Sequence, residues 1–129
     1  MRVVFDTNIF ISALTLPGGR ADDAMMRIIN GEDTLAISRE IIDEVLTVLA
    51  RKFSKDAEAL SRVAVNLAGI GELVSPSEKL AVLDDEADNR MLECAVAGKA
   101  EAIVTGDKAM LMLKRYQNIK IIALTGYLD

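Results

Sequence analysis

Short apolar runs alternate with helix-periodic segments along the whole chain. Val3-Val4-Phe5, Leu35-Ala36-Ile37 and Ala102-Ile103-Val104 are typical of buried strands, and Glu72–Val74 and Lys120–Ala123 are expected to form two more. The intervening segments have helical periodicity: Ile9–Leu14, Asp22–Asn30, Ser38–Phe53 with Ser38 as N-cap, Lys55–Ala68, Asp85–Ala97 and Lys108–Leu113. This alternation predicts an α/β fold with a central parallel five-stranded sheet that is flanked by helices on both faces.

No internal repeat, low-complexity tract or Pro/Gly-rich linker divides the sequence, so we expect one domain over residues 1–129. Hydrophobic residues make up 51% of the chain, yet no apolar run approaches the roughly 20 residues that span a bilayer. The amino terminus already reads as a strand, which leaves no room for a signal peptide. Cys94 is the single cysteine, so a disulfide within the chain is excluded. We therefore expect a reducing location, the cytoplasm.

The absence of histidine narrows the chemistry that the chain can perform. Without imidazole there is no Ser-His-Asp triad and no His-ligated zinc, and one cysteine cannot build a Cys-based zinc site. Oxygen ligands remain, and clustered carboxylates repel one another unless a cation or protons neutralise them. The net charge of −5 argues against binding nucleic acid by bulk attraction. It does not exclude a nuclease whose acids surround a metal ion.

Two aspartates follow predicted strands at their carboxyl ends. Asp6 comes directly after Val3-Val4-Phe5, and Asp107 comes after Ala102-Ile103-Val104 and a Thr-Gly turn. Open parallel α/β sheets bind ligands at the carboxyl ends of their strands, so both aspartates are candidate metal ligands. Each is also a good N-cap for the helix that follows it, and capping is compatible with catalysis.

Asp88 interrupts the inward face of a predicted helix. It lies on the same stripe as Met91, Leu92 and Ala95, where a hydrophobic residue is expected. A buried carboxylate needs a cation, a network of donors or a place in a cleft. The stripe therefore favours a functional acid, and the alternative is a partly exposed acid in the first helical turn.

Glu44 and Asp43 stand at opposite borders of the apolar face of the helix that begins after Ser38. Periodicity does not separate them, and a solvated border residue explains either one. Taken by itself, the helical pattern gives no functional role to Glu44.

Taken together, segments in a fixed order resemble the PIN-domain ribonucleases, and most closely the toxins of toxin–antitoxin systems related to VapC. The likeness covers nearly the whole chain. The segments that carry it are Val3-Val4-Phe5-Asp6-Thr7-Asn8, then Ser38 to Leu49 with Glu44, then Asp88-Asn89-Arg90-Met91-Leu92-Glu93-Cys94-Ala95, then Ile103-Val104-Thr105-Gly106-Asp107.

The resemblance implies a metal-dependent hydrolase that cleaves RNA with Mg²⁺ or Mn²⁺. Its implied catalytic and metal-binding acids are Asp6, Glu44, Asp88 and Asp107. It also implies supporting roles for Asn8 and Thr105, and it favours Glu44 over Asp43. Relatives often carry an extra aspartate where this chain has Ala87, and Asp85 is the candidate that compensates. A small antitoxin is the implied partner, a homodimer is common in the family, and no membrane is involved.

Basic residues that could contact RNA phosphates occur in two places. Arg51, Lys52 and Lys55 form the densest basic patch, and Arg20 follows the Pro-Gly-Gly loop near the Asp6 end of the predicted sheet. Solvated helix ends are the favoured explanation of these cations, and contact with RNA phosphates is the alternative.

Two other functions remain open at this stage. One is a PIN fold that has lost catalysis and acts as a binding module. The other is a receiver-type phosphoacceptor domain, which shares the length and the strand-end aspartate. A receiver predicts an acid pair after the first strand and a lysine after the last, whereas Phe5 precedes Asp6 and Leu124-Thr125-Gly126 follows the last strand.

Overall fold

A computed structural model describes residues 1–129 and contains one six-stranded sheet of order β3-β2-β1-β4-β6-β5. Five strands run parallel and pair in the sequence β3, β2, β1, β4 and β6, while β5 pairs antiparallel with β6 at the edge. The strands are β1 (Arg2–Phe5), β2 (Thr34–Ser38), β3 (Glu72–Val74), β4 (Ala102–Thr105), β5 (Arg115–Tyr116) and β6 (Ile119–Ala123). Parallel strands require crossover connections, and helices supply them.

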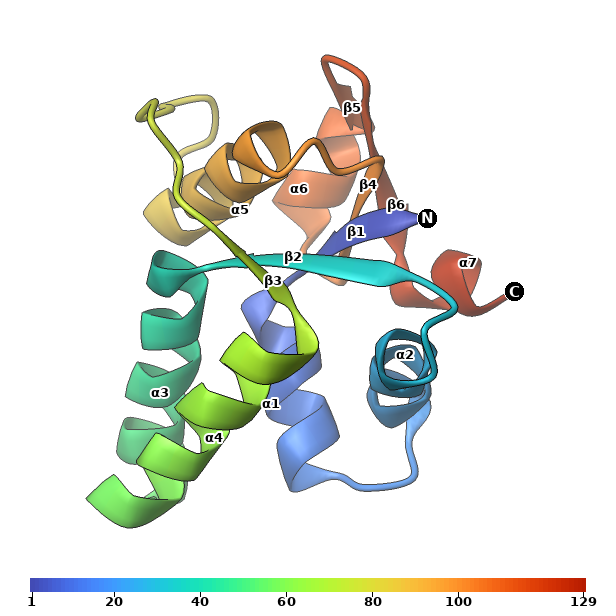
Figure 1. Ribbon diagram of the computed structural model, residues 1–129. Coiled ribbons are helices and arrows are strands. Elements are labelled where there is room, and N and C mark those ends of the chain that lie inside the picture. Colours follow the sequence, from blue (N-terminus) through green and yellow to red (C-terminus); the bar gives the residue numbers. More distant parts are fainter.

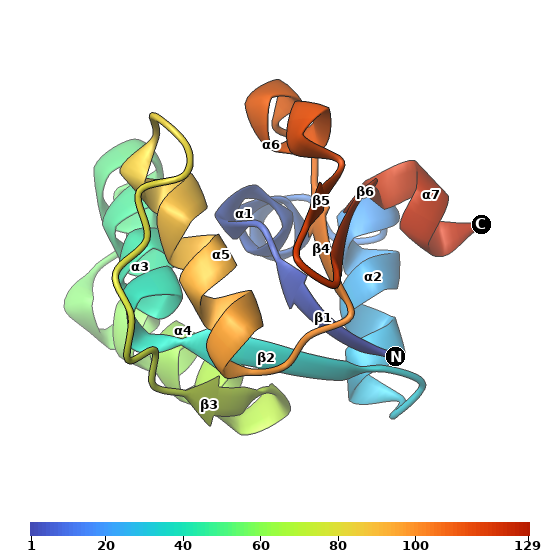
Figure 2. The same ribbon diagram turned by 90° about the horizontal axis from the view of Figure 1, so that it is seen from above.

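Helices cover both faces of the sheet. Figure 1 shows α1, α2, α3 and α4 below it and α5 and α6 above it, and Figure 2 gives the view from above. The helices are α1 (Thr7–Thr15), α2 (Arg20–Ile29), α3 (Arg39–Phe53), α4 (Ala57–Ile70), α5 (Glu86–Ala97), α6 (Lys108–Leu113) and α7 (Leu124–Leu128). The predicted architecture of a mainly parallel sheet between two helical layers is confirmed.

Two predictions about element number were wrong. The sheet has a sixth strand, β5, because Gln117 adopts a positive φ of 54° and closes a hairpin without the glycine that usually marks such a turn. The carboxyl-terminal helix α7 was also missed, since its five residues include Gly126 and are too few for a periodic pattern. Its Tyr127 is buried and packs edge-on against Phe5.

The order of the strands creates a switch point between β1 and β4. From β1 the chain moves outward to β2 and β3, then crosses the other face through α5 and returns to β4 on the opposite side of β1. The register pairs Phe5 with Val104, so both strands end at the same level. A receiver-type domain requires strand order 2-1-3-4-5, which this sheet does not have, and that alternative is therefore excluded.

One continuous core joins the sheet to both helical layers. The three central strands β1, β2 and β4 are almost completely buried, and Phe5, Leu35 and Ile103 have no exposed surface. The chain packs tightly against β2 at Gly98, where an added Cβ would lie 2.8 Å from the Cβ of Ala36. The predicted end of α5 at Gly98 is thus also a packing requirement.

The loop between β3 and α5 is held by side chains of α5. Asn89 is buried, accepts hydrogen bonds from the backbone N–H groups of Val82 (3.0 Å) and Leu83 (2.8 Å), and donates to the Leu83 carbonyl (2.7 Å). Glu93 accepts from the Leu80 N–H at 2.7 Å. These contacts fix the chain where it enters the first turn of α5.

None of the helices combines the length and the apolar composition that a membrane span requires.

Candidate functional site

Asp6 lies at the carboxyl edge, the side of the sheet where the parallel strands end. Its side chain is only 5% exposed, and its backbone N–H continues the β1–β4 pairing by donating to the Val104 carbonyl at 2.9 Å. Oδ1 accepts from the Asn8 N–H at 3.0 Å, which makes Asp6 the N-cap of α1. Oδ2 accepts from the Thr105 hydroxyl at 2.5 Å. Both oxygens are therefore fixed, and each keeps capacity for another ligand.

Asp107 lies beside Asp6 because β4 neighbours β1. Thr105 connects them: its hydroxyl donates to Asp6 and accepts from the Asp107 N–H at 3.0 Å. Asp107 is also the N-cap of α6, since its Oδ2 accepts from the Met110 N–H at 2.9 Å. Asp6 and Asp107 are thus both strand-end acids and helix N-caps, and one side-chain conformation of each serves both roles.

Asp88 lies near this pair and belongs to α5, which covers the face of the sheet opposite α1. It is 6% exposed in the first turn of α5, on the same buried stripe as its apolar neighbours, as the periodicity indicated. The pKa of the Asp88 carboxyl is raised to about 7, first by burial and then by the charges of Asp107, Asp85 and Asp6 and a hydrogen bond with the Asp107 side chain. Asp6, Asp88 and Asp107, hereafter the acid cluster, lie close enough to repel one another.

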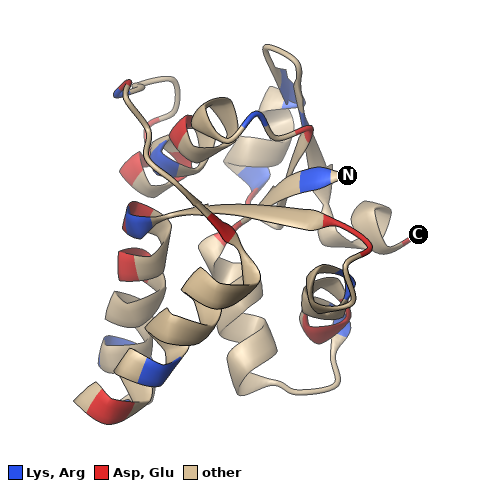
Figure 3. Cartoon of the chain, viewed as in Figure 1, with Lys and Arg blue, Asp and Glu red and all other residues tan.

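Asp85 stands at the margin of the acid cluster. It is exposed and caps α5 by accepting from the Ala87 N–H at 2.8 Å. Its charge contributes to the raised pKa of Asp88. Three carboxylates, those of Asp85, Glu86 and Asp88, therefore stand at the start of α5. Figure 3 shows acidic positions gathered at this end of α5 and along the upper part of α3.

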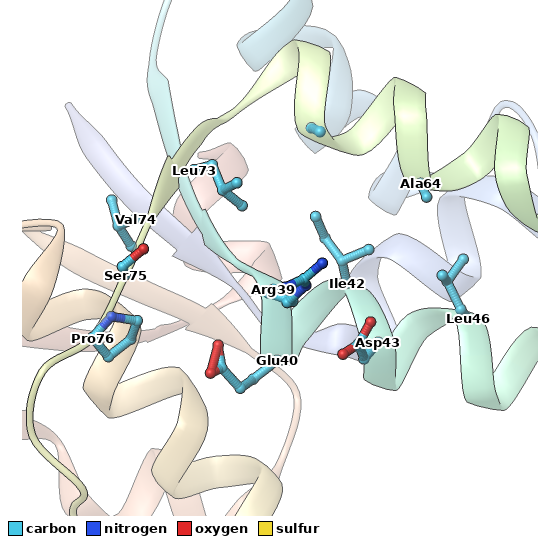
Figure 4. Close-up of a pocket in the computed structure, with 11 residues that line it drawn as sticks. Arg39, Glu40, Ile42, Asp43, Leu46, Ala64, Leu73, Val74, Ser75 and Pro76 are labelled. Carbon is cyan, nitrogen blue, oxygen red and sulfur yellow. The ribbon is translucent and has the colours of Figure 1, made fainter.

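Glu44 is exposed on α3 and is not part of this contact network. It forms no hydrogen bond or ion pair, and it is not among the charges that raise the pKa of Asp88. Its neighbour Asp43 lines a cavity of about 470 Å³ between α3, α4 and β3, together with Arg39 and Pro76 (Figure 4). Glu44 is not among the residues that line that cavity.

The predicted basic residues separate into near and far sets. Arg20, the first residue of α2, lines a cavity that also includes Asn8 and Gly106, and so lies beside the acid cluster. Arg51 and Lys52 occupy the last turn of α3 and Lys55 follows it. At about 1.5 Å per residue, the end of α3 lies roughly 20 Å from its start at the carboxyl edge.

Asn89, which fixes the loop that leads into the first turn of α5, was not predicted as a site residue. The available signal was a buried polar pair, Asp88-Asn89, where the periodic pattern calls for apolar residues. Cys94 is buried, and burial raises the pKa of its thiol to about 12, so it is no thiolate nucleophile at neutral pH.

The acid cluster has the chemistry of a divalent-cation site without a preformed cage. Carboxylates that raise one another's pKa are stabilised by a hard cation with oxygen ligands. No three of the chain's acids converge in a geometry that would hold a metal ion by themselves. Mg²⁺ usually takes one or two carboxylates and completes its shell with water and substrate phosphate, so the donor set fits that ion.

Comparison with known proteins agrees with this architecture. The chain is 29% identical over 118 residues to Uncharacterized protein MJ1680 of Methanocaldococcus jannaschii, an alignment that covers 88% of this chain and 76% of that protein. Among solved structures it is similar to VapBC2 from Rickettsia felis bound to a promoter DNA fragment, with a TM-score of 0.65 and 18% identity over 95% of this chain and 98% of the other. VapBC-1 from nontypeable Haemophilus influenzae gives a TM-score of 0.65 and 15% identity over 97% and 99% of the two chains.

These structural likenesses concern the fold. A family model described as PIN domain matches residues 2–109. The matched range includes β1, α3, α5, β4 and the acid cluster. The chain therefore belongs to the PIN-domain family.

Proposed function

We propose that this protein is a metal-dependent endoribonuclease and the toxin of a toxin–antitoxin pair. The observation that carries the proposal is the acid cluster at the switch point between β1 and β4, where burial and neighbouring charges raise the pKa of Asp88 to about 7. Ligand sites of open α/β sheets lie at such switch points. Membership of the PIN-domain family supports a nuclease at this place.

The proposed ligands of Mg²⁺ or Mn²⁺ are Asp6, Asp88 and Asp107, with Glu44 completing the site when RNA is bound. A bound divalent ion supplies a water of lowered pKa and neutralises charge on the phosphodiester. The chain's own part is positioning. Thr105 and the Asn8 N–H orient the two Asp6 oxygens, and the α6 N-terminus orients Asp107.

No side chain of the site acts as a covalent nucleophile in this scheme. The acid cluster contains only carboxylates, and the hydroxyl of Thr105 is fully buried and donates to Asp6. In the proposed scheme water would attack the phosphorus, the P–O bond to the leaving nucleotide would break and its oxygen would take up a proton from solvent, while the acids would bind charge and orient groups.

An antitoxin partner is part of the proposal, because both solved structures cited above are VapBC proteins. An apolar cavity of about 270 Å³ between α1, α2 and α4 suits an inserted apolar side chain of such a partner, and Phe10, Leu14 and Met25 line it. We also expect a homodimer and action in the cytoplasm, where the free thiol of Cys94 stays reduced.

The test is cleavage of single-stranded RNA by the purified protein with Mg²⁺, with Mn²⁺ and in excess chelator. We expect cleavage only with metal, and we expect Asp107→Asn to reduce its rate by about 10²–10³-fold. Asparagine is also a good N-cap, so this change preserves the start of α6. The matched control is Asp56→Asn, which alters an exposed N-cap aspartate of α4 that accepts from the Ala59 N–H at 2.9 Å.

The same cleavage assay tests the proposed role of Glu44. Glu44→Gln should lower the cleavage rate, whereas Asp43→Asn, a change of equal charge one residue away, should not. Equal cleavage rates for the wild type and Asp107→Asn would contradict the acid cluster as the active centre, and a wild type that cleaves nothing with either metal would favour the alternative of a binding module without catalysis. Chelator-resistant cleavage would contradict the metal mechanism alone.

A further inference from the structure

A cavity of about 310 Å³ lies beside the acid cluster on the α1 side of the sheet. Its lining comes from α1, the start of α2, the turn after β4 and the start of α7. The lining residues are Asn8, Ile9, Ser12, Arg20, Ala21, Gly106 and Leu124. None of them is acidic and one is cationic, in a chain of net charge −5. Hereafter this is the Arg20 cavity.

Short covalent links join the Arg20 cavity to the acid cluster. Asn8 is two residues after Asp6, and its backbone N–H donates to Asp6 Oδ1 at 3.0 Å. Gly106 lies between Thr105 and Asp107. A strand of nucleic acid whose phosphate reaches the acid cluster therefore has its adjoining nucleotide within reach of this cavity.

The side chains around the Arg20 cavity match the parts of a nucleotide. Arg20 is exposed and forms no ion pair, so its guanidinium is free to bind a phosphate with two parallel hydrogen bonds. The exposed Asn8 amide offers donors and an acceptor, which can pair with a base edge or with the 2′-hydroxyl of ribose. The apolar part of the wall can contact the face of a base.

Gly106 keeps the cavity open although the fold does not require glycine there. Its φ is not in the left-handed region, and an added Cβ would meet no atom within 4 Å. Backbone geometry and packing thus leave this position free for a larger residue. The space beyond Gly106 is available to a ligand.

We propose that the Arg20 cavity is a nucleotide subsite, which binds the nucleotide next to the scissile phosphate of an RNA strand. Arg20 contacts the phosphate, and Asn8 and Ser12 contact the base or ribose. These residues set substrate affinity and register, while the acid cluster performs hydrolysis. The inference rests on the proposed ribonuclease function, since it names where that substrate binds.

The test measures binding of a fluorescent single-stranded RNA by anisotropy, in Mg²⁺, with Asp107→Asn as the common background. Adding Arg20→Gln should weaken binding about tenfold, the usual loss for one charge-assisted contact. It should also make the dependence of log affinity on log salt shallower by about 0.7, the value for one phosphate of a single strand. Arg115→Gln, an exposed arginine in β5 at the other end of β6, should change neither quantity.

Two further measurements separate a nucleotide site from a general anion site. A mixture of the four nucleoside 5′-monophosphates should displace the RNA at lower concentration than inorganic phosphate, and equal displacement would overturn the inference. In otherwise wild-type protein, Arg20→Gln and Gly106→Ala should raise the KM for RNA cleavage and leave kcat within about threefold.

The two proposals fail in different ways. Binding that Arg20→Gln leaves at the level of Arg115→Gln overturns the nucleotide subsite, even where the wild type cleaves RNA. Binding that depends on Arg20 in a wild-type protein that cleaves nothing overturns the ribonuclease proposal and keeps the subsite. RNA binding that is undetectable in the wild type and in the Asp107→Asn background overturns the subsite.

Discussion

Asp33 and Asp88 lie at opposite ends of the strands of the same sheet, and their pKa values are shifted in opposite directions. Asp33 lies at the amino edge, just before β2, and accepts hydrogen bonds from the Met1 amino group (2.8 Å) and the Tyr127 hydroxyl (2.6 Å). Burial alone would raise the Asp33 pKa, but these donors and the nearby charge of Arg27 lower it overall. Asp88, at the carboxyl edge, has acids for neighbours, and its pKa is raised to about 7.

The difference separates an acid with a structural role, Asp33, from Asp88, an acid of the proposed metal site. At Asp33 the chain supplies its own cations and donors, and Arg27 extends the network by donating to the Tyr127 and Leu128 carbonyls at 2.8 and 2.9 Å. That network ties α2 and α7 to the amino terminus. At Asp88 the chain supplies no cation, so the negative charge stays uncompensated. An uncompensated cluster of acids costs stability and is what a cation-binding site requires.

The largest expected effect is on catalysis. Asp88→Asn should reduce RNA cleavage by about 10²–10³-fold, because it removes one carboxylate from the proposed metal site. The same change should leave the metal-free protein at least as stable as the wild type at pH 8, since it relieves repulsion within the acid cluster. Urea unfolding in chelator and a cleavage time course check the two halves. A variant that is inactive because it is unfolded would show a lowered urea midpoint, against this expectation.

The next effect concerns pH. In the folded chain Asp88 keeps its proton up to about pH 7, whereas in the unfolded chain it ionises near pH 3.9. Between these values the folded state binds more protons, so this residue makes stability in chelator fall as pH rises from about 4 to about 7. Asp33 acts in the opposite sense, since its lowered pKa contributes stability that is lost as the pH falls below about 4.

Urea midpoints at pH 5 and pH 8, with chelator and with Mn²⁺, measure this dependence. We expect Asp88→Asn to flatten the decline in chelator, and Mn²⁺ to stabilise the wild type more at pH 8 than at pH 5, because the ion binds the ionised carboxylates. An identical decline in the wild type and Asp88→Asn would assign the pH dependence to other groups.

The smallest expected effect is at the amino edge. Asp33→Asn should lower stability by about 1 kcal/mol through the weakened hydrogen bond to Tyr127, a shift in Tm of roughly 4 °C. Cleavage activity should be unchanged, because the residue lies at the opposite end of the strands. Glu32→Gln, an exposed neighbour, serves as the control of equal charge. A loss of cleavage activity in Asp33→Asn at temperatures where the variant is folded would contradict a purely structural role for Asp33.

Local sequence was sufficient for most elements and for their boundaries to within two residues. Ser38 was predicted as the N-cap of the long helix, and its hydroxyl accepts from the Ile41 N–H at 3.3 Å. Strand-end acids and the interrupted stripe of α5 were visible for the same reason, since each is a short-range pattern of polar and apolar residues. Elements of two to five residues, β5 and α7, carry too little periodicity to be found this way.

The sequence by itself determined which acids follow buried strands and which acid stands in an apolar stripe, because these are properties of neighbours along the chain. Only the tertiary structure placed Asp88 against Asp107, formed the Arg20 cavity from four separate segments, and made Asp43, but not Glu44, part of the cavity between α3, α4 and β3. Those relations depend on the crossover that sets β4 beside β1, and no local pattern records which strands become neighbours.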